Sequence, residues 1–313
     1  MTTASYDYII IGAGSAGCVL ANRLSEDSNV QVLLIEAGPA DRDPRIKIPL
    51  LWMKFVQNRR HDWGYETQPE QHMDGREIEC VRGKVLGGCS SINAMTVVRG
   101  NVNDYERWKR GGLEQWGYDD VLPYFRKMES WAGGDDGIRG GDGPFKVQSS
   151  SYQDPMYNGY LQAAEQIGLG LSKDYNGRDQ LGLARSQQNI FEGRRFSAAD
   201  AYLKPVLQRP NLKLKLKQFV TRIVFEDGRA IGVELAGSNG QLEIVRASRE
   251  VIVSTGSINS PHLLMLSGIG PAEQLKRQDI DVVVDAPDVG QNLQDHMSAS
   301  VGYRRKQQGP FVD

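Results

Sequence analysis

An uninterrupted apolar run near the start of the chain leads into a turn that is rich in glycine. The run occupies residues 8–11 and is followed at once by Gly12, Gly14 and Gly17. Such a run is typical of a strand that is buried on both faces of a parallel sheet. The apolar residues at 18–24 then recur at helical spacing. The pattern therefore predicts a strand, a tight turn and a helix in immediate succession.

The spacing Gly-x-Gly-x-x-Gly in this setting is the fingerprint of a dinucleotide-binding unit. Gly12 permits the sharp turn, Gly14 lets the backbone approach a pyrophosphate, and Gly17 lets the helix pack closely on the strand. The free N–H groups and positive dipole end of the helix would face the phosphates. A second, largely apolar run at 30–36 predicts the next strand. It ends in Glu36, where an acidic residue can hold a ribose hydroxyl.

A second glycine-rich stretch, residues 82–96, mixes glycines with apolar and small polar residues. Gly83, Gly87 and Gly88 allow positive φ and close approach of the backbone. The stretch predicts a backbone wrapped around a flat polar ligand, with a surface loop as the alternative. Its apolar residues, which favour burial, are Val85, Leu86, Ile92 and Met95, and its small polar residues are Cys89, Ser90, Ser91 and Asn93.

The region between these stretches and residue 143 shows little periodicity. Residues 37–60 are interpreted as a loop with irregular apolar pieces, in which Trp52 and Phe55 stand at helical spacing. Trp63 is either a core residue, which is slightly favoured, or an aromatic wall beside a ring system. Asp119 or Asp120 is expected to cap a short helix. The glycine-rich segment 133–143 predicts a loop, either a mobile cover or a plain surface connection.

A change of composition places the start of a second domain near residue 145. We expect a strand at 144–147 and then a helix that begins at Asp154-Pro155 and ends at Gly168. The chain turns back toward the first domain at 193–204. Arg194 and Arg195 are interpreted as solvated side chains rather than functional ones.

Residues 211–254 have the pattern of several strands. Leucine and lysine alternate at 212–217, which predicts a strand with one buried and one wet face. Asp227-Gly228 and Asn239-Gly240 each predict a hairpin turn. The apolar run at 250–254 predicts a buried strand that returns to the first sheet. A helix follows, with Ser260 as its cap, proline in its first turn and Gly268 at its end.

Composition narrows the class of protein. The 313 residues are 40% hydrophobic and 24% charged with a net charge of -2, as in a soluble globular protein of two domains. Neither nucleic acid nor an anionic membrane is expected as the main partner. Cys18, Cys80 and Cys89 form no Cys-x-x-Cys pair, so no redox disulfide, zinc knuckle or other metal site is expected. No transmembrane segment is expected either. We expect a cytoplasmic protein, with peripheral membrane association left open.

Four ordered stretches, at 12–17, 83–93, 256–270 and 289–296, resemble the signatures of the glucose–methanol–choline (GMC) oxidoreductases, which are FAD-dependent alcohol-oxidising enzymes. The resemblance implies an α/β fold: a Rossmann-like FAD-binding domain with the beginning of an α+β substrate domain. It places the FAD-binding domain at 1–144 and 205–297. An incomplete substrate-binding domain would occupy 145–204 and 298–313.

The resemblance also implies hydride transfer from an alcohol carbon to the flavin, giving an aldehyde. FAD is expected to bind non-covalently, because Ile92 stands where covalent members carry a histidine. The catalytic histidine pair of the family would lie beyond Asp313, so we assign no catalytic residue. We expect a fragment that is inactive by itself. Ser298, where choline-oxidising members place a glutamate, favours an uncharged alcohol. The electron acceptor, whether oxygen, a quinone or a cytochrome, stays open.

Cofactor contacts are carried over from the family residue by residue. The pyrophosphate is expected at Gly12–Gly17, the adenosine ribose at Glu36, the adenine at the backbone of Val220, and the flavin beside Trp63 and residues 82–96. The full set is Gly12, Gly14, Ser15, Ala16, Gly17, Glu36, Ala37, Trp63, Arg82, Leu86, Gly87, Gly88, Ser90, Asn93, Ala94, Met95, Thr96, Val220, Thr255 and Gly256.

Four other functions compete with this one. A flavin disulfide reductase or NAD(P)H-linked flavoprotein needs a second nucleotide fingerprint, and the sequence at 268–273 lacks the last glycine. A nicotinamide-only dehydrogenase leaves residues 83–93 unexplained. A non-catalytic FAD-binding protein, or a choline dehydrogenase proper, stays open as an alternative.

Overall fold

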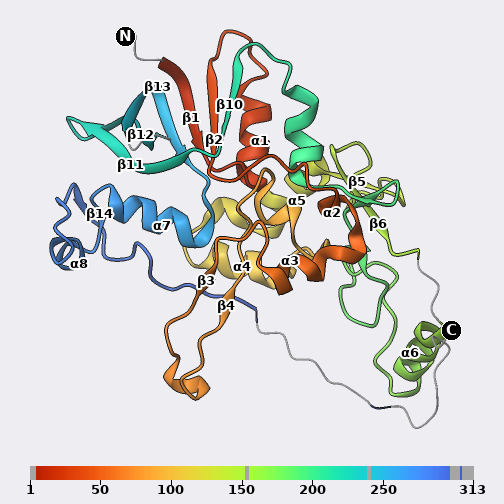
Figure 1. Ribbon diagram of the computed structural model, residues 1–313. Helices are drawn as coiled ribbons and strands as arrows, with labels where there is room; N and C mark the ends of the chain where they lie inside the picture. The colour runs from red at the N-terminus through yellow and green to blue at the C-terminus, as the bar shows by residue number, and fades with distance from the viewer. Residues whose placement is uncertain (1–4, 152–154, 238–240, 297–303, 305–313) are drawn as a thin grey trace.

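The computed structural model describes residues 5–151, 155–237, 241–296 and 304. A six-stranded sheet runs in the order β10-β2-β1-β13-β12-β11. Its strands are β1 (Ser5–Ile11), β2 (Val32–Glu36), β10 (Leu212–Leu216), β11 (Phe219–Glu226), β12 (Arg229–Ala236) and β13 (Leu242–Val253). The first four in this order are parallel, and the β11–β12 hairpin adds antiparallel strands (Figure 1). The α/β fold and the predicted first-sheet strands are confirmed.

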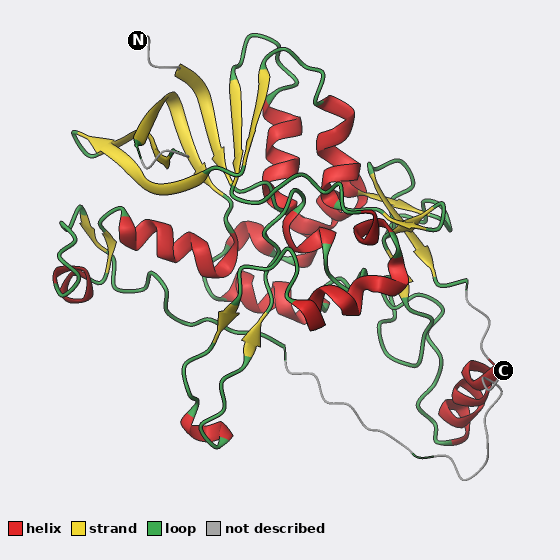
Figure 2. Cartoon of the chain, viewed as in Figure 1, coloured by secondary structure: helices red, strands yellow, loops and turns green. Residues whose placement is uncertain are grey.

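Both faces of the central strands are buried, which explains their continuous apolar runs. Ile10 and Leu34 pack with Cys18 of helix α1 (Ser15–Leu24) on one face. Ile9 and Leu33, whose side chains point the other way, pack with residues that include Leu263 of helix α7 (Gly256–Leu266). Alternate residues of a strand point to opposite faces. The sheet therefore lies between two apolar clusters, with helices beside it (Figure 2).

Residues 37–60, expected to form a loop, contain three short helical segments instead: α2 (Pro44–Lys47), η1 (Pro49–Leu51) and α3 (Trp52–Asn58). Asp43 caps α2 by accepting the N–H of Arg45, and proline stands at the first helical position. Phe55 then packs into a small core with Ile46 and Ile92. The cap and tertiary burial form helices where periodicity is too short to predict them.

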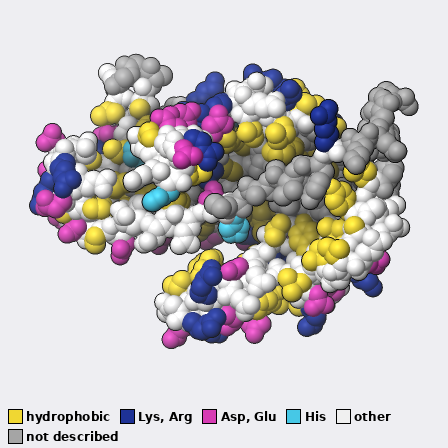
Figure 3. Space-filling model, turned by 90° about the horizontal axis from the view of Figure 1, so that it is seen from below, with side chains coloured by type: hydrophobic (Ala, Val, Ile, Leu, Met, Phe, Trp, Pro, Cys, Tyr) yellow, Lys and Arg dark blue, Asp and Glu magenta, His cyan; other side chains and the backbone are white. Residues whose placement is uncertain are grey.

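A short antiparallel pair, β3 (Tyr65–Glu66) and β4 (Glu79–Cys80), follows and carries η2 (Gln71–Met73) between its strands. Figure 1 shows this arm projecting from the body of the molecule. Seen from below, side chains of both charge signs are interspersed with apolar ones, and neither sign dominates that face (Figure 3).

The predicted helix near Asp119 and Asp120 exists as α5 (Tyr118–Met128), but its cap is Gly117. Asp120 is the third helical residue, and its carboxylate accepts the N–H of Gly117. The preceding helix α4 (Val102–Arg110) was not predicted, although Asn101 and Asp104 form a capping box there. That box was a usable signal in the sequence. The short η3 (Gly88–Ser91) and η4 (Glu114–Trp116) complete this region.

The segment 133–143 is a loop, as predicted, but it is anchored and does not fit the expectation of a mobile cover. Arg139 is fully buried. Its side chain donates to Glu129 at 2.8 Å and to Asp174 at 2.7 Å. The loop joins β5 (Glu129–Trp131) to β6 (Phe145–Ser149), so the predicted strand at 144–147 is confirmed. A buried, paired guanidinium holds a segment firmly because breaking the pair leaves a buried charge.

Between β6 and the sheet strand β10 the chain forms short elements: α6 (Pro155–Gln166), β7 (Gln187–Gln188), β8 (Ile190–Phe191), β9 (Arg194–Arg195), η5 (Ala199–Leu203) and η6 (Lys204–Val206). Gly168 has a positive φ just beyond α6, as predicted for its end. The predicted cap, Asp154, lies outside the described residues. Strand β10 is at the sheet edge, and its alternation of leucine and lysine is confirmed as a buried and a wetter face.

The turn at Asp227-Gly228 is confirmed, with positive φ at both residues. Asn239-Gly240 lies outside the described residues, although β12 and β13 on either side pair antiparallel. Helix α7 begins at Gly256, not at the predicted cap Ser260, whose hydroxyl lies 3.1 Å from that of Thr255. Gly268 has a φ of 85° beyond the helix end.

The last elements are β14 (Ile269–Gly270), α8 (Ala272–Lys276) and β15 (Val284–Asp285). Within the described part of the chain, no helix combines the length and the apolar character that crossing a membrane demands.

Candidate functional site

A cavity of about 470 Å³ opens at the carboxyl ends of β1, β2 and β13. Strand β1 has β2 on one side and β13 on the other, so the chain reverses its direction of travel through the sheet at this point. In open α/β sheets, such a switch point is where ligands bind. Twelve of the predicted cofactor residues line the cavity, namely Gly12, Gly14, Ser15, Ala16, Glu36, Ala37, Trp63, Arg82, Gly88, Val220, Thr255 and Gly256.

The glycines at 12–17 differ in what the protein itself requires of them. A Cβ on Gly17 would lie 1.9 Å from the carbonyl oxygen of Gly12. Gly12 has a φ of 95°, and a Cβ there would lie 2.7 Å from the carbonyl oxygen of Ser254. A Cβ on Gly14 would meet nothing within 4 Å, and Gly14 lines the cavity. The first and third glycines serve the fold, whereas the second keeps the cavity open.

Glu36 holds the turn from the end of β2. One carboxylate oxygen accepts the N–H of Ala13 and the other that of Gly38, each at 2.8 Å. Burial raises the pKa of Glu36, while the backbone donors of Gly38 and Ala13 and the charge of Lys84 oppose that rise. Each carboxylate oxygen can accept a second hydrogen bond. A hydroxyl in the cavity could therefore bind Glu36 without breaking either backbone contact.

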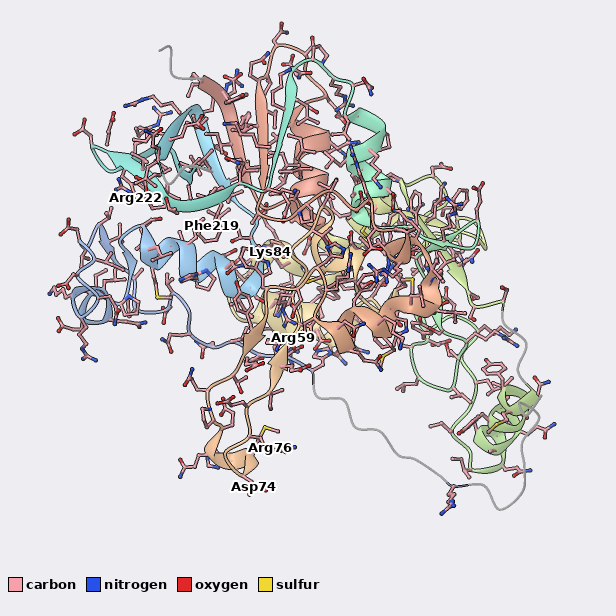
Figure 4. All side chains as sticks on the ribbon, in the orientation of Figure 1. Arg59, Asp74, Arg76, Lys84, Phe219 and Arg222 are labelled. Carbon is pink, nitrogen blue, oxygen red and sulfur yellow. The ribbon has the colours of Figure 1, made fainter. Side chains whose placement is uncertain are left out.

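Trp63 lies at the Val220 end of the cavity and is half-buried. Its ring stacks on that of Tyr65, with the centroids 5.9 Å apart, and approaches the ring of Phe219 at 6.2 Å. The Lys84 ammonium lies 4.4 Å from the Trp63 ring centroid, and Figure 4 labels Lys84 and Phe219. The sequence placed Trp63 on the flavin side. Trp63 contacts residues of both groups: its backbone N–H donates to the carbonyl of Arg82 at 3.0 Å, and its ring approaches Phe219, the neighbour of Val220.

The 83–96 segment packs on the first glycine turn, backbone against backbone. Gly87 and Gly88 have φ values of 88° and 54°, and a Cβ on Gly88 would lie 2.8 Å from the Cα of Gly14. The N–H of Gly87 donates to the carbonyl of Ala13 at 2.8 Å. Gly83 lacks a positive φ, but a Cβ on it would lie 2.5 Å from the carbonyl of Gly88. The two glycine-rich turns are therefore mutually dependent.

Eight predicted cofactor residues do not line the cavity: Gly17, Leu86, Gly87, Ser90, Asn93, Ala94, Met95 and Thr96. Within the 82–96 segment, the side chains of Leu86, Ser90 and Met95 are buried. Met95 has a φ of 63°. Asn93 and Thr96 are exposed, as is Cys89 at the rim of the cavity.

Arg195, expected to be solvated, is 1% exposed. Its Nε donates to the carbonyl of Ile46 at 2.9 Å, and its Nη1 donates to Asn93 Oδ1 at 2.8 Å and to the carbonyl of Ser90 at 3.2 Å. Burial lowers the pKa of Arg195 to about 10, although the charge of Asp200 opposes this. Backbone carbonyls, which no sequence pattern reveals, accept its hydrogen bonds. Its neighbour Arg194 is exposed, as expected.

Several cavity residues were not predicted. Tyr65 donates from its hydroxyl to Asn259 Oδ1 at 2.6 Å, which joins the arm to α7 across the cavity. His262 is exposed on α7 and lines the cavity. The position of Asn259 and His262 within the 256–270 signature was a usable signal. Arg82 Nη2 lies 3.4 Å from Asp295 Oδ2, which brings the 289–296 segment to the cavity. In the described ranges, no cluster of three metal-ligating side chains occurs.

Residues 6–298 match the sequence model of the GMC oxidoreductase family. The oxygen-dependent choline dehydrogenase of Sinorhizobium fredii (strain NBRC 101917 / NGR234) is 52% identical over 291 residues, which are 93% of this chain and 53% of that protein. Its counterpart in Brucella anthropi is 48% identical over 295 residues, 94% of this chain and 53% of that protein. The chain thus spans about half the length of the curated relatives it matches.

Solved structures agree in fold. Pyridoxine 4-oxidase from Mesorbium loti superposes with a TM-score of 0.86 at 36% identity, over 90% of this chain and 56% of that one. A formate oxidase variant from Aspergillus oryzae RIB40, studied for modification of its FAD, gives a TM-score of 0.86 at 33% identity, over 95% of this chain and 53% of that one.

Proposed function

The chain belongs to the GMC oxidoreductase family, and we propose that it is the FAD-binding part of an enzyme that oxidises an alcohol. The observation that carries the proposal is the continuity of the cavity. One space is lined by Glu36 and Val220, by the open face of Gly14, and by Gly88 and Cys89. An extended dinucleotide needs a ribose acceptor, a pyrophosphate cradle and a ring surface in that order.

The residues fit FAD in the following way. The adenine lies beside Phe219 and the backbone of Val220, its ribose is held by Glu36, and Trp63 lines the flavin side together with Arg82. The pyrophosphate lies against Gly14, Ser15 and Ala16, where the α1 N-terminus offers N–H groups that have no partner within the helix. The remaining predicted residues, among them Thr255, Gly256 and those of the 82–96 segment, support or line the flavin side.

FAD binds non-covalently in this proposal, because Ile92 is an apolar side chain buried to 4% exposure and offers no nucleophile. When bound, the flavin supplies the acceptor for a hydride from the alcohol carbon. The residues of this chain bind and orient it: Arg82 and Cys89 line the flavin end, and the glycine turns exclude side chains from the pyrophosphate. None of the four histidines is assigned as the base, and the catalytic pair of the family matches no position up to Asp313.

The domain division is also part of the proposal, with FAD binding at 1–144 and 205–297 and substrate binding at 145–204 and 298–313. The substrate is a small alcohol. Relatives named as choline dehydrogenases favour choline, whereas Ser298, which lies outside the described residues, favours an uncharged alcohol. The relatives' name points to oxygen as the acceptor, with a quinone or cytochrome as alternatives. The absence of a cysteine pair supports a cytoplasmic location.

Bleaching of the flavin absorbance without oxygen tests this function. FAD-loaded residues 1–313 and the uncut gene product are mixed anaerobically with choline or with an uncharged primary alcohol, and then with a dye acceptor. We expect both proteins to take up FAD and only the uncut product to be bleached and turn over. Failure of both to bind FAD contradicts the cofactor assignment, and turnover by residues 1–313 alone contradicts the assignment of catalysis to later residues.

A further inference from the structure

A fully buried guanidinium lies behind the glycine-rich segment 82–96 and is hydrogen-bonded to it. Arg195 is 1% exposed, and its Nη2 is buried with no hydrogen-bond partner among the described residues. Its three hydrogen bonds go to uncharged acceptors: the Ile46 carbonyl, the Ser90 carbonyl and the Asn93 amide oxygen. Within the part of the chain that the structure describes, no carboxylate forms an ion pair with Arg195. Burying a charge in this way is costly.

The nearest acidic group is already neutralised by other cations. Asp200 lies 2.6 Å from the Lys47 ammonium and 2.8 Å from that of Lys204. Asp41 lies 3.3 Å from Lys47 and 2.5 Å from Lys204. Two carboxylates therefore face two ammonium groups. No carboxylate remains to balance the charge of Arg195. The buried side chains behind the 82–96 segment therefore carry one uncompensated positive charge.

Only one side chain separates this charge from the surface proposed to hold the flavin. Arg195 Nη1 donates to Asn93 Oδ1 at 2.8 Å, and Asn93 is exposed. The same oxygen accepts the N–H of Met95 at 3.1 Å, a residue with a φ of 63°. Arg195 also holds the carbonyl of Ser90 at 3.2 Å. The guanidinium thus fixes both ends of the turn from Ser90 to Met95.

We propose that Arg195 is a positioning residue that fixes Asn93 against the flavin and places a buried positive charge behind it, which raises the reduction potential of the bound cofactor. This inference rests on the proposed FAD site. A positive charge in a low-dielectric interior favours whichever form of a neighbouring group carries more negative charge, and reduction adds electrons to the flavin. Burying the Arg195 charge destabilises the fold, but the same charge makes the bound cofactor accept electrons more readily.

Four variants of the full chain, each saturated with FAD, test this by equilibration with a reference dye of known potential. Arg195→Gln removes the charge, and the ratio of reduced to oxidised flavin at fixed poise should fall at least tenfold, about 30 mV for a two-electron couple. Arg195→Lys keeps the charge and should stay within threefold of the parent. Arg194→Gln removes the same formal charge from an exposed neighbour and should change nothing. Asp200→Asn should shift the potential in the opposite direction.

The outcomes separate this inference from the proposed function. If the parent chain binds no FAD, the proposed function fails. If it binds FAD and Arg195→Gln leaves the potential unchanged, only the role of Arg195 is overturned. Equal loss of FAD in Arg195→Gln and Arg195→Lys also overturns it, because a charge role requires lysine to substitute. Should Arg195→Gln not fold, an unchanged or more negative potential in Asp200→Asn overturns it.

Discussion

The 83–96 segment is held from two sides by two different kinds of contact. On one side it meets the 12–17 turn through backbone atoms alone, with Gly88 against Gly14 and the Gly87 N–H on Ala13. On the other side it meets residues 195–200 through side chains, with Arg195 on Asn93 and Ser90. The first contact tolerates no Cβ on Gly88, whereas the second depends on charge.

This difference shows what each contact can do. Backbone packing fixes the distance between the two turns. It cannot adjust the chemistry of a ligand, because every residue contributes the same atoms. Buried side chains can adjust the chemistry of a ligand, because their charge acts on it through the 83–96 segment. One side of the segment shapes the cavity, and the other side sets its electrostatics.

Gly17→Ala should have the largest effect. The added Cβ would lie 1.9 Å from the Gly12 carbonyl oxygen, so the helix must move off the strand, and we expect a loss of more than about 3 kcal/mol of unfolding free energy. Chemical denaturation measures this. Gly159→Ala is the matched control, because a Cβ there meets nothing within 4 Å in helix α6. It should gain roughly 0.5–1 kcal/mol, and equal stability of the two variants would refute the account of the turn.

Acid should weaken the ion pairs that Asp200 makes with Lys47 and Lys204, next to Arg195. Burial alone would raise the pKa of Asp200, but hydrogen bonds from Lys204 and Lys47 outweigh it and lower the pKa from 3.8 to about 2. A carboxylate with a depressed pKa stabilises the fold above its unfolded pKa and loses that contribution as pH falls through the folded value. We expect about 2 kcal/mol to be lost between roughly pH 4 and pH 2.

Asp200→Asn provides the comparison for this titration. Its unfolding free energy should be lower than the parent's at neutral pH, and the gap should narrow as pH falls toward 2. A gap that stays constant across this window would show that the Asp200 carboxylate contributes no pH-dependent stability.

Gly14→Ala should weaken FAD binding without changing the stability of the fold, unlike Gly17→Ala. A Cβ there meets no protein atom within 4 Å, so the unfolding free energy should change by less than about 0.5 kcal/mol. The methyl group would, however, point into the proposed pyrophosphate space. We expect at least a tenfold weaker affinity for FAD, about 1.4 kcal/mol, measured by fluorescence titration. Unchanged affinity would show that Gly14 does not face the ligand.

Ser90→Ala tests a single hydroxyl that ties the two segments together. The Ser90 hydroxyl donates to the Gly87 carbonyl at 2.6 Å and accepts the N–H of Ala198 at 3.0 Å. Its loss leaves these two backbone groups without that partner, so we expect about 1–2 kcal/mol of lost unfolding free energy. Ser151→Ala, at an exposed serine, is the control and should be neutral. Neutral results for both would mean that Ser90 is not a tie between the two segments.

The sequence predicted the parts of this molecule that depend on local pattern. Ile9 and Ile10 lie in a continuous apolar run because both faces of β1 are buried, and Gly12 and Gly17 stand at fixed spacing because backbone meets backbone. The resemblance to a family, on its short signatures, supplied the cofactor. It also placed Trp63 on the flavin side, but it could not reveal the contact of Trp63 with Phe219, which joins distant segments.

Buried charges were the largest failure of sequence reasoning. Arg195 resembles its exposed neighbour Arg194 in every local respect, and only the folded chain supplies the Ile46 and Ser90 carbonyls that accept its hydrogen bonds. The loop at 133–143 was expected to be either a mobile cover or a plain surface connection, yet Arg139 within it is buried against Glu129. Ion pairs and carbonyl contacts between residues ten or more positions apart leave no periodic pattern in the sequence.

Calorimetric titration of the full chain with FAD, repeated with ADP or riboflavin present as a competitor, tests the central claim most directly. A dinucleotide that lies extended from Val220 past Gly14 to Cys89 must occupy the subsites of both halves. We predict one FAD per chain, with an apparent affinity that each competitor weakens. Absence of saturable FAD uptake, or uptake that ADP does not weaken, would contradict the account.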